Sequence, residues 1–455
     1  MRVDRSRLPD IGPDPSFRFP SIVRHRLANG LDVRTVEHHT VPVVSLVLQI
    51  DGGLGADPPG SEGLAAITAD MADEGTGELS AIEVAERLAS IGGDYDVEVG
   101  ADATWFSLTT LARFAERGAA FLADTLIRPS LRETDFTRLQ ELRLDRLRQI
   151  KDLPPALADR AFLSLMYGDH PYGHLAIGTE SALRAFRLAH VEEFHARTYT
   201  PTRARLVVVG PMSHDRLHMV ALEAFSTWQE SSSSNDVNTV ESVEPVVLPG
   251  RLAMVARPAA AQSELRIGHL SARRDTPDYP ALLVMNAVLG GQFVSRINLK
   301  LREEKGYTYG ARTGFDWRKG LSPFTLQASV HTAATADAIR DSLDEFGALR
   351  GARPPSDVEM TLAKASLTRG YPRNFETAQQ VARSVAQLAL YGLPDTYFEE
   401  FVPKVNVIDA SDVVRVANQY VDPARAVTLV VGDHQAVNDS LGVLGLGEPR
   451  LLPES

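Results

Sequence analysis

The chain of 455 residues contains no cysteine. This absence excludes disulfides, thiolate metal ligands and cysteine nucleophiles. It leaves the redox compartment open, because a chain without cysteine is suited to oxidising and reducing surroundings alike. Any metal site or nucleophile must therefore be built from other side chains.

Long apolar runs and an excess of basic charge are also missing. No run approaches 18 apolar residues, so no membrane-spanning helix is expected. The first 17 residues lack the apolar core of a signal peptide. The net charge of -12 disfavours nucleic acid and anionic membranes as partners, while leaving basic peptides open. We therefore expect a cytoplasmic protein, or a periplasmic one if a signal peptide has been removed, with no nucleic-acid or membrane partner.

A polar segment divides the chain almost in half. Residues Glu230 to Pro245 include four consecutive serines, Ser231 to Ser234, and show no helical periodicity. Such composition is typical of a linker. We predict an N-terminal domain at 1–229, a linker at 230–246 and a C-terminal domain at 247–455.

The two halves end alike. One reads Tyr199-Thr-Pro201 and then ARLVVVG up to Gly210; the other reads Tyr420-Val-Asp-Pro and then AVTLVVG up to Gly432. Both valine-rich runs are typical of buried strands that end at glycine. The offset of about 220 residues indicates an internal duplication.

Strand and helix patterns alternate in both halves. Predicted strands lie at Val43–Ile50, Thr104–Leu111, Leu265–Leu270, Phe324–Val330 and Thr428–Val431. Predicted helices lie at Ala81–Ile91, Ala112–Ile127, Glu133–Ile150, Pro280–Leu289, Ala334–Leu349 and Ser356–Leu367. This order predicts an α+β layer structure with helices packed on one face of each sheet.

An ordered set of short motifs runs along the chain. In the first half these are Leu27-Ala-Asn29-Gly30-Leu31 with Pro42, Gly63-Leu64-Ala65, Gly75-Thr76, Gly92-Gly93, His170-Pro171-Tyr172-Gly173, Gly178-Thr179, Phe194-His195 and Tyr199-x-Pro201. In the second half they are Leu289-Gly290-Gly291, Ser295-Arg296 and the run from Leu301 to Tyr309. The set resembles the pitrilysin or insulinase-type zinc metallopeptidases, among them the mitochondrial processing peptidase. No single motif is decisive, but together they cover roughly 25–435. The resemblance implies two homologous α/β sandwich domains in tandem, facing another such pair across a chamber.

The zinc motif of that family is altered here. Active members carry H-x-x-E-H directly after the Gly-Leu-Ala frame: two histidines bind zinc and the glutamate is the general base. This sequence has Ala66 in place of the first histidine, Ala69 in place of the base and Asp70 in place of the second histidine. A methyl group neither binds zinc nor takes a proton. The resemblance therefore implies a degenerate site with no metal ligands or cofactor in this chain.

The third zinc ligand of the family comes from the helix predicted at Glu133–Ile150. Glu141 and Asp145 lie there, and neither aligns with assurance. Metal sites elsewhere are not expected: His38 and His39 point apart if they lie in a strand, and His170 and His174 flank a turn rather than a helix.

Arg302 and Tyr309 match another feature of the family. In these peptidases an arginine, and a tyrosine seven residues later, reach from the second domain to the active site. A tyrosine hydroxyl and a guanidinium can both donate to the oxygen on which negative charge develops, and can hold the substrate backbone. The competing interpretation pairs Arg302 with a carboxylate and puts Tyr309 in the core. We expect Tyr307, which does not fit the spacing, to serve packing.

The predicted function follows from the loss of the zinc-binding histidines and the general base and from the presence of Arg302 and Tyr309. We expect a non-catalytic subunit, inactive alone, that completes an endopeptidase with a homologous zinc-bearing partner. Arg302 and Tyr309 would hold the peptide substrate, and zinc would belong to the partner. Three alternatives stay open: a structural or assembly protein of the same fold, an independent peptide-binding module, and an active peptidase with unusual ligands.

Overall fold

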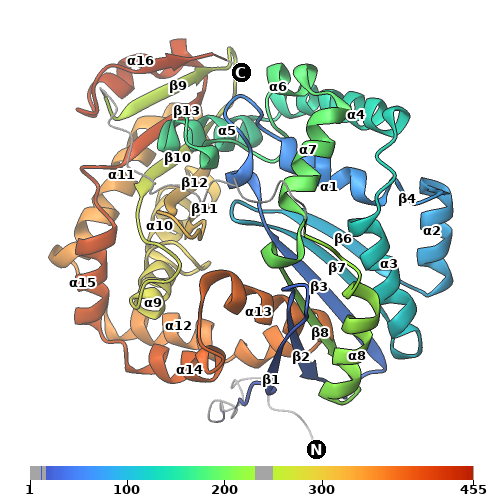
Figure 1. The fold of residues 1–455 in the computed structure, drawn as a ribbon. Coiled ribbons are helices and arrows are strands. Elements are labelled where there is room, and N and C mark those ends of the chain that lie inside the picture. Colours follow the sequence, from blue (N-terminus) through green and yellow to red (C-terminus); the bar gives the residue numbers. More distant parts are fainter. Residues whose placement is uncertain (1–11, 13–16, 231–249, 454–455) are drawn as a thin grey trace, which may run out of the picture.

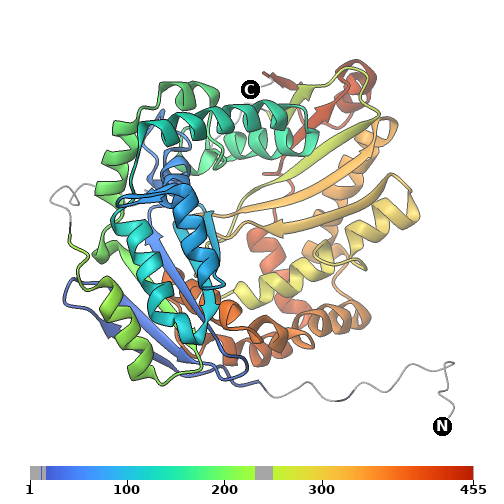
Figure 2. The ribbon, with the colours of Figure 1, turned by 90° about the vertical axis from the view of Figure 1, so that its right-hand side faces the viewer.

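Two six-stranded mixed sheets lie side by side in the computed structural model, which describes residues 12, 17–230 and 250–453 (Figures 1 and 2). The predicted linker at 230–246 therefore lies outside the described residues, apart from Glu230. The α+β class with two mixed sheets in tandem confirms the predicted fold.

The first sheet belongs to the first half of the chain. Its strands, in spatial order, are β1 (Ile22–Arg26), β2 (Asp32–Glu37), β8 (Ala204–Gly210), β3 (Val43–Asp51), β7 (Ala103–Leu111) and β6 (Asp94–Val99). A short ribbon, β4 (Gly75–Thr76) with β5 (Leu79–Ser80), stands apart from it.

The second sheet belongs to the second half. Its order is β11 (Thr308–Phe315), β12 (Pro323–His331), β10 (Gln262–Leu270), β13 (Val427–Gly432), β9 (Leu252–Ala256) and β14 (Arg450–Leu452). Strand β11 is therefore an edge strand.

The topology confirms the duplication that the sequence indicates. In the first sheet the parallel pair β2 and β8 is followed by three antiparallel pairings. In the second sheet the parallel pair β9 and β13 is followed by three antiparallel pairings in the same way. The two valine-rich runs, β8 and β13, occupy equivalent places. The sixth strands differ, because β1 is antiparallel to β2 whereas β14 is parallel to β9.

Helices surround the sheets. Those of the first half are α1 (Leu64–Asp70), α2 (Ala81–Ser90), α3 (Ala115–Ile127), α4 (Glu133–Lys151), α5 (Pro154–Tyr167), α6 (Glu180–Ala185), α7 (Leu188–Thr198) and α8 (His214–Phe225). Those of the second half are α9 (Tyr279–Leu289), α10 (Arg296–Asn298), the π-helix η7 (Leu299–Glu304), α11 (Thr335–Gly347), α12 (Asp357–Thr368), α13 (Ala378–Tyr391), α14 (Tyr397–Val407), α15 (Ala410–Tyr420) and α16 (His434–Gly442). None of the helices in the described residues is long and apolar enough to cross a membrane.

The prediction that helices cover one face of each sheet is wrong. Helix α13 of the second half packs on the first sheet against β3 and β8, and α5 of the first half packs on the second sheet against β10 and β13 (Figure 1). The reason lies in the strands: seven consecutive residues of β3 are buried, so both faces need apolar cover. The halves thus exchange one helix each, and the shared packing ties them together.

Candidate functional site

The helix that corresponds to the family's zinc helix is held by a buried carboxylate. Asp57 accepts hydrogen bonds from the backbone N–H groups of Gly63 (2.8 Å) and Ala65 (2.6 Å) at the start of α1. Its other close contact is Nε2 of His174, at 2.9 Å. The turn that contains His174 therefore positions α1, because its imidazole is bound to the carboxylate that caps this helix.

Three residues of α1 stand where the family carries two ligands and the base. Ala66 and Ala69 are fully buried. Asp70 forms an ion pair with Arg143 of α4, with 2.8 Å between Oδ2 and Nε. Nη1 of Arg143 also donates to the carbonyl oxygen of Ala176, at 3.0 Å. The only charged group among the three is thus neutralised by a neighbouring guanidinium.

Arg143 of α4 is not among the site residues predicted from the sequence. Glu141 and Asp145 are both exposed, and Asp145 pairs with Arg148 of the same helix. The buried face of α4 carries Phe136, Leu139, Leu144 and Leu147. Helical periodicity places residue 143 beside this face, so the apolar pattern could have identified it.

These residues do not fit a zinc ion. A protein zinc site takes three or four imidazole, thiolate or carboxylate ligands in tetrahedral geometry. The positions on α1 offer two methyl groups and one carboxylate, and the side chain of α4 that contacts this carboxylate is an arginine, which cannot bind a metal ion.

A cluster of acidic side chains follows α1. Burial, together with the nearby negative charges of Glu74 and Asp70, raises the pKa of Asp73 to about 6. Arg138 of α4 forms an ion pair with Glu74. Two arginines of α4 therefore face the acidic residues at the end of α1.

The second group of predicted site residues lies in the other half of the molecule. Arg302 lies on the π-helix η7. π-helical turns are rare in proteins as a whole, and those that occur are often found at functional sites. The guanidinium of Arg302 lies over the ring of Phe293, 4.5 Å from the centroid, and its Nε is 3.5 Å from a carboxylate oxygen of Glu303. Phe293 is itself exposed. Arg302 therefore has a carboxylate neighbour, as one part of the competing interpretation expects.

Tyr309 lies on the edge strand β11, and its side chain is 87% exposed. The pairing register with β12 shifts between Thr308 and Ala311, which marks a bulge at this residue. Thr308 holds the bulge by donating to the carbonyl oxygen of Ser329 (2.6 Å) and accepting from the N–H of Gly310 (3.1 Å). Tyr309 is thus not a core tyrosine, whereas Tyr307 packs against the core as expected.

Asn298 joins the segments that carry the pair. Its amide donates to the carbonyl oxygen of Phe293 (2.7 Å), and its Oδ1 accepts from the N–H of Ala311 (3.0 Å). A Cβ at Gly290 would lie 2.4 Å from Oγ1 of Thr313, so this glycine lets the loop approach β11. Gly290-Gly291 therefore serves close packing.

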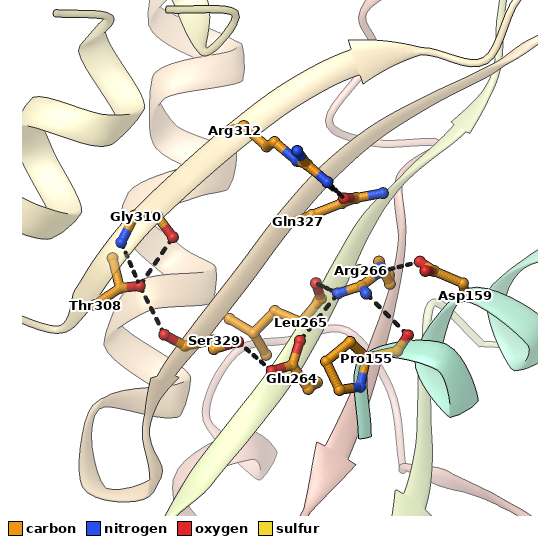
Figure 3. A network of polar contacts seen from close by, with 10 residues as sticks. All are labelled: Pro155, Asp159, Glu264, Leu265, Arg266, Thr308, Gly310, Arg312, Gln327 and Ser329. Atoms are coloured by element: carbon orange, nitrogen blue, oxygen red, sulfur yellow. Dashed lines mark hydrogen bonds and ion pairs between the residues drawn. The ribbon is translucent and has the colours of Figure 1, made fainter. Parts of the chain in front are cut away.

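A cavity of about 530 Å³ opens beside these segments. It lies between the loop Gly290–Phe293, the strands β10 to β12 and the start of α5. Figure 3 shows its polar wall: Arg266 binds Asp159 (2.6 Å) and Glu264 (3.3 Å), and Arg312 donates to Gln327 (2.9 Å). The cavity thus offers both donors and acceptors next to Phe293 and the bulge.

The structure does not bring the two groups of predicted residues together. α1 belongs to the helix layer of the first sheet, and Arg302 and Tyr309 belong to the second sheet. Within the described part of the chain, no hydrogen bond or ion pair joins Asp70 to Arg302 or Tyr309.

Comparison with known proteins agrees with this architecture. Residues 32–180 match the family model described as Insulinase (Peptidase family M16), and residues 185–367 match the one described as Peptidase M16 inactive domain. An uncharacterized zinc protease of Mycobacterium leprae is 24% identical over 78% of this chain and 79% of its own length. An uncharacterized zinc protease of Rickettsia bellii is 22% identical over 90% and 96%.

Solved structures show the same fold. A peptidase M16 inactive domain from Pseudomonas fluorescens superposes with a TM-score of 0.84 at 23% identity, covering 90% of this chain and 98% of that one. A protease from Helicobacter pylori gives 0.84 at 19% identity, with 91% and 100% covered. With adjacent matches to both domains of one family and a shared fold along the chain, this protein belongs to the M16 (insulinase) family of peptidases.

Proposed function

We propose that this chain is a non-catalytic subunit of a heteromeric zinc peptidase. In this proposal Arg302 and Tyr309 hold the peptide substrate and its scissile carbonyl in the active site of a homologous, zinc-bearing partner. The observation that carries it is the exposure of Tyr309, 87%, on a bulged edge strand beside a cavity. Packing within this chain does not account for a tyrosine in that position.

The surroundings of α1 support the non-catalytic part of the proposal. The general base of active members is replaced by Ala69, whose methyl group cannot accept a proton. Asp70 is engaged by Arg143, so its carboxylate is not free to bind a metal ion. The relatives above are named zinc proteases, and in the proposed assembly that activity belongs to the partner.

The chemistry of the pair suits a substrate-holding role. Negative charge develops on the carbonyl oxygen as a peptide bond is attacked, and a donor placed there lowers the barrier. The Tyr309 hydroxyl can donate one hydrogen bond, and the Arg302 guanidinium can donate several while staying charged. Phe293 keeps that guanidinium in place by stacking, since its ring centroid is 4.5 Å away.

Substitution of the pair tests these roles in the assembled peptidase. Arg302→Ala and Tyr309→Phe are each expected to lower kcat/KM of the pair by about tenfold or more, because removal of one oxyanion donor typically costs about 10²–10³ in rate. Cleavage of a quenched fluorescent peptide gives the rate, and analytical ultracentrifugation gives the extent of assembly.

The neighbouring Tyr307 provides the matched control. It packs against the core, so Tyr307→Phe is expected to leave the cleavage rate unchanged. Normal turnover by both Arg302→Ala and Tyr309→Phe in fully assembled pairs would refute the assigned roles. That result would favour a structural or assembly protein, for which neither side chain is needed.

A further inference from the structure

A buried arginine lines a second cavity, among the helices of the second half. The cavity measures about 430 Å³ and lies among α9, α12, α13, α14 and the short helix Tyr371–Phe375. Arg274, in the loop after β10, lines it and is only 6% exposed. This volume falls within the range of about 300–1,000 Å³ that is usual for small-molecule sites.

Aromatic rings surround the Arg274 guanidinium. Its central carbon is 3.6 Å from the ring centroid of Tyr279, 5.1 Å from that of Tyr397 and 5.4 Å from that of Tyr391. The faces of the rings attract the cation, but the rings carry no net charge. The rings therefore stabilise the cation but do not neutralise its charge.

Arg274 differs from the other buried arginines of the described residues. Arg34, Arg266, Arg296 and Arg318 are similarly buried, and each has a carboxylate oxygen at 2.5–3.4 Å. Arg274 forms no ion pair with any described residue, and its Nη1 is buried without a hydrogen-bond partner. A buried charge without a counter-ion is costly, so the site favours an anion.

A second unsatisfied group lies in the same wall. The hydroxyl of Tyr397 is buried and makes no short hydrogen bond to a described residue, although the Arg274 guanidinium lies near enough to lower its pKa by hydrogen bonding. Desolvation raises its pKa to about 12, although Arg274 opposes the rise, so at neutral pH the hydroxyl keeps its proton and can donate. The remaining wall is largely apolar, with Leu283, Phe375 and Phe401 among its residues.

We propose that this cavity binds a small carboxylate with an aromatic or branched apolar body, its carboxylate accepting from Arg274 and Tyr397. The ligand is either a free carboxylic acid or the C-terminal residue of a peptide, which share this chemistry. A monoanion fits better than a phosphate group, because Arg274 is the one cationic side chain among the described residues that line the cavity. The exposed side chains of Ser366, Asn374 and Gln387 line the open end.

Calorimetric titration of the full chain at pH 7 tests the site with two matched pairs of probes. The first pair is 3-phenylpropionate and its uncharged amide; the second is N-acetyl-Ala-Phe with a free carboxylate and its C-terminal amide. In each pair we expect the acid to bind at least about tenfold more tightly, since a charge-assisted hydrogen bond is lost in the amide. Binding of both acids points to free carboxylates in general, and binding of the peptide acid alone points to peptide termini.

Three variants test whether the acids bind in this cavity. Arg274→Met keeps the bulk of the side chain and removes the charge, so the preference for the acids should vanish. Gln387→Trp blocks the open end and should weaken both acids, which keeps the test available if Arg274→Met does not fold. Arg383→Met is the control: this residue lies on α13 but pairs with Asp96 and Glu98, and binding should be unchanged.

Two results would overturn the proposal. One is equal binding of acid and amide by the unmodified chain, including no binding of either. The other is an acid preference that persists in Arg274→Met, or undiminished binding of both acids by Gln387→Trp. In both cases the aromatic rings alone would account for the burial of Arg274.

Discussion

At the scale of single residues, an ion pair with Arg143 holds Asp70, which stands where the zinc motif described above has its second histidine. The side chain of Arg143 is 11% exposed, so its charge depends on Asp70 for compensation. The sequence predicted the altered positions on α1 but not this partner. The search for a third zinc ligand points only to acidic residues of α4, such as Glu141 and Asp145, and so does not single out an arginine.

A double-mutant cycle with Asp70→Ala and Arg143→Ala measures this interaction. We expect a coupling free energy of about 1–3 kcal/mol in urea unfolding, because one partner is largely desolvated. The exposed pair Asp145 and Arg148 on the same helix serves as control, with an expected coupling below about 0.5 kcal/mol. Equal coupling in both cycles would show that Arg143 is not held by Asp70.

Asp73 gives a pH-dependent prediction. Its pKa in the folded chain, about 6, lies above the usual value of 3.8, so the folded state binds this proton more tightly than the unfolded state. The stability linked to it is fully present below about pH 4 and is lost as the pH rises to about 6. Asp73→Asn should therefore raise the free energy of unfolding at pH 7.5 by about 1–3 kcal/mol, with no gain at pH 4.

Urea unfolding of Asp73→Asn at the two pH values checks this expectation. Asp94 is exposed on β6, and Asp94→Asn should change little at either pH. A stabilisation of the same size at pH 4 and pH 7.5 would contradict the raised pKa.

At the scale of elements, the bulge in β11 and the π-helix before it could not be predicted from the run Leu301 to Tyr309. Spacing alone indicated that Arg302 and Tyr309 belong together. Whether they point to solvent depends on an irregular helix and a register shift, and these are set by contacts with residues outside the run. Asn298 supplies two of those contacts.

Asn298→Ala should therefore disturb both segments at once. We expect kcat/KM of the assembled peptidase to fall by about tenfold, since small misplacements of substrate-holding groups are costly in rate. Asn418→Ala, on α15, likewise removes two side-chain hydrogen bonds, both donated to carbonyl oxygens, and controls for general destabilisation. If both variants lost activity only in proportion to stability, Asn298 would not be a positioning residue.

At the scale of the whole molecule, the exchange of α5 and α13 makes the halves interdependent. The strands and helices predicted from the sequence lie within three residues of their observed ends, and α5 and α13 are not among them. The sequence does not predict the exchange. A strand that is apolar along its length indicates that both of its faces are covered, but it does not indicate which helices cover them. Val47 and Val207, for example, share one core cluster with Val381 and Val385 of α13.

Cutting the chain within 231–249 tests this interdependence. A protease site inserted there should allow complete cleavage while the two fragments stay associated and unfold in one transition. The first fragment alone, lacking α13, should expose the apolar face of β3 and β8 and bind a hydrophobic dye such as ANS. Two separate transitions in the cut protein, or a well-folded isolated first fragment, would mean that each half folds independently.

The most direct test of the proposed division of labour is peptide cleavage in the presence of zinc by three samples: this chain alone, a homologous chain with an intact H-x-x-E-H motif from the same source, and their mixture. If this chain is the substrate-holding subunit, only the mixture is expected to cleave the peptide. Chelator-sensitive cleavage by this chain alone would contradict this expectation, because Ala66 and Ala69 would then not have removed the zinc site.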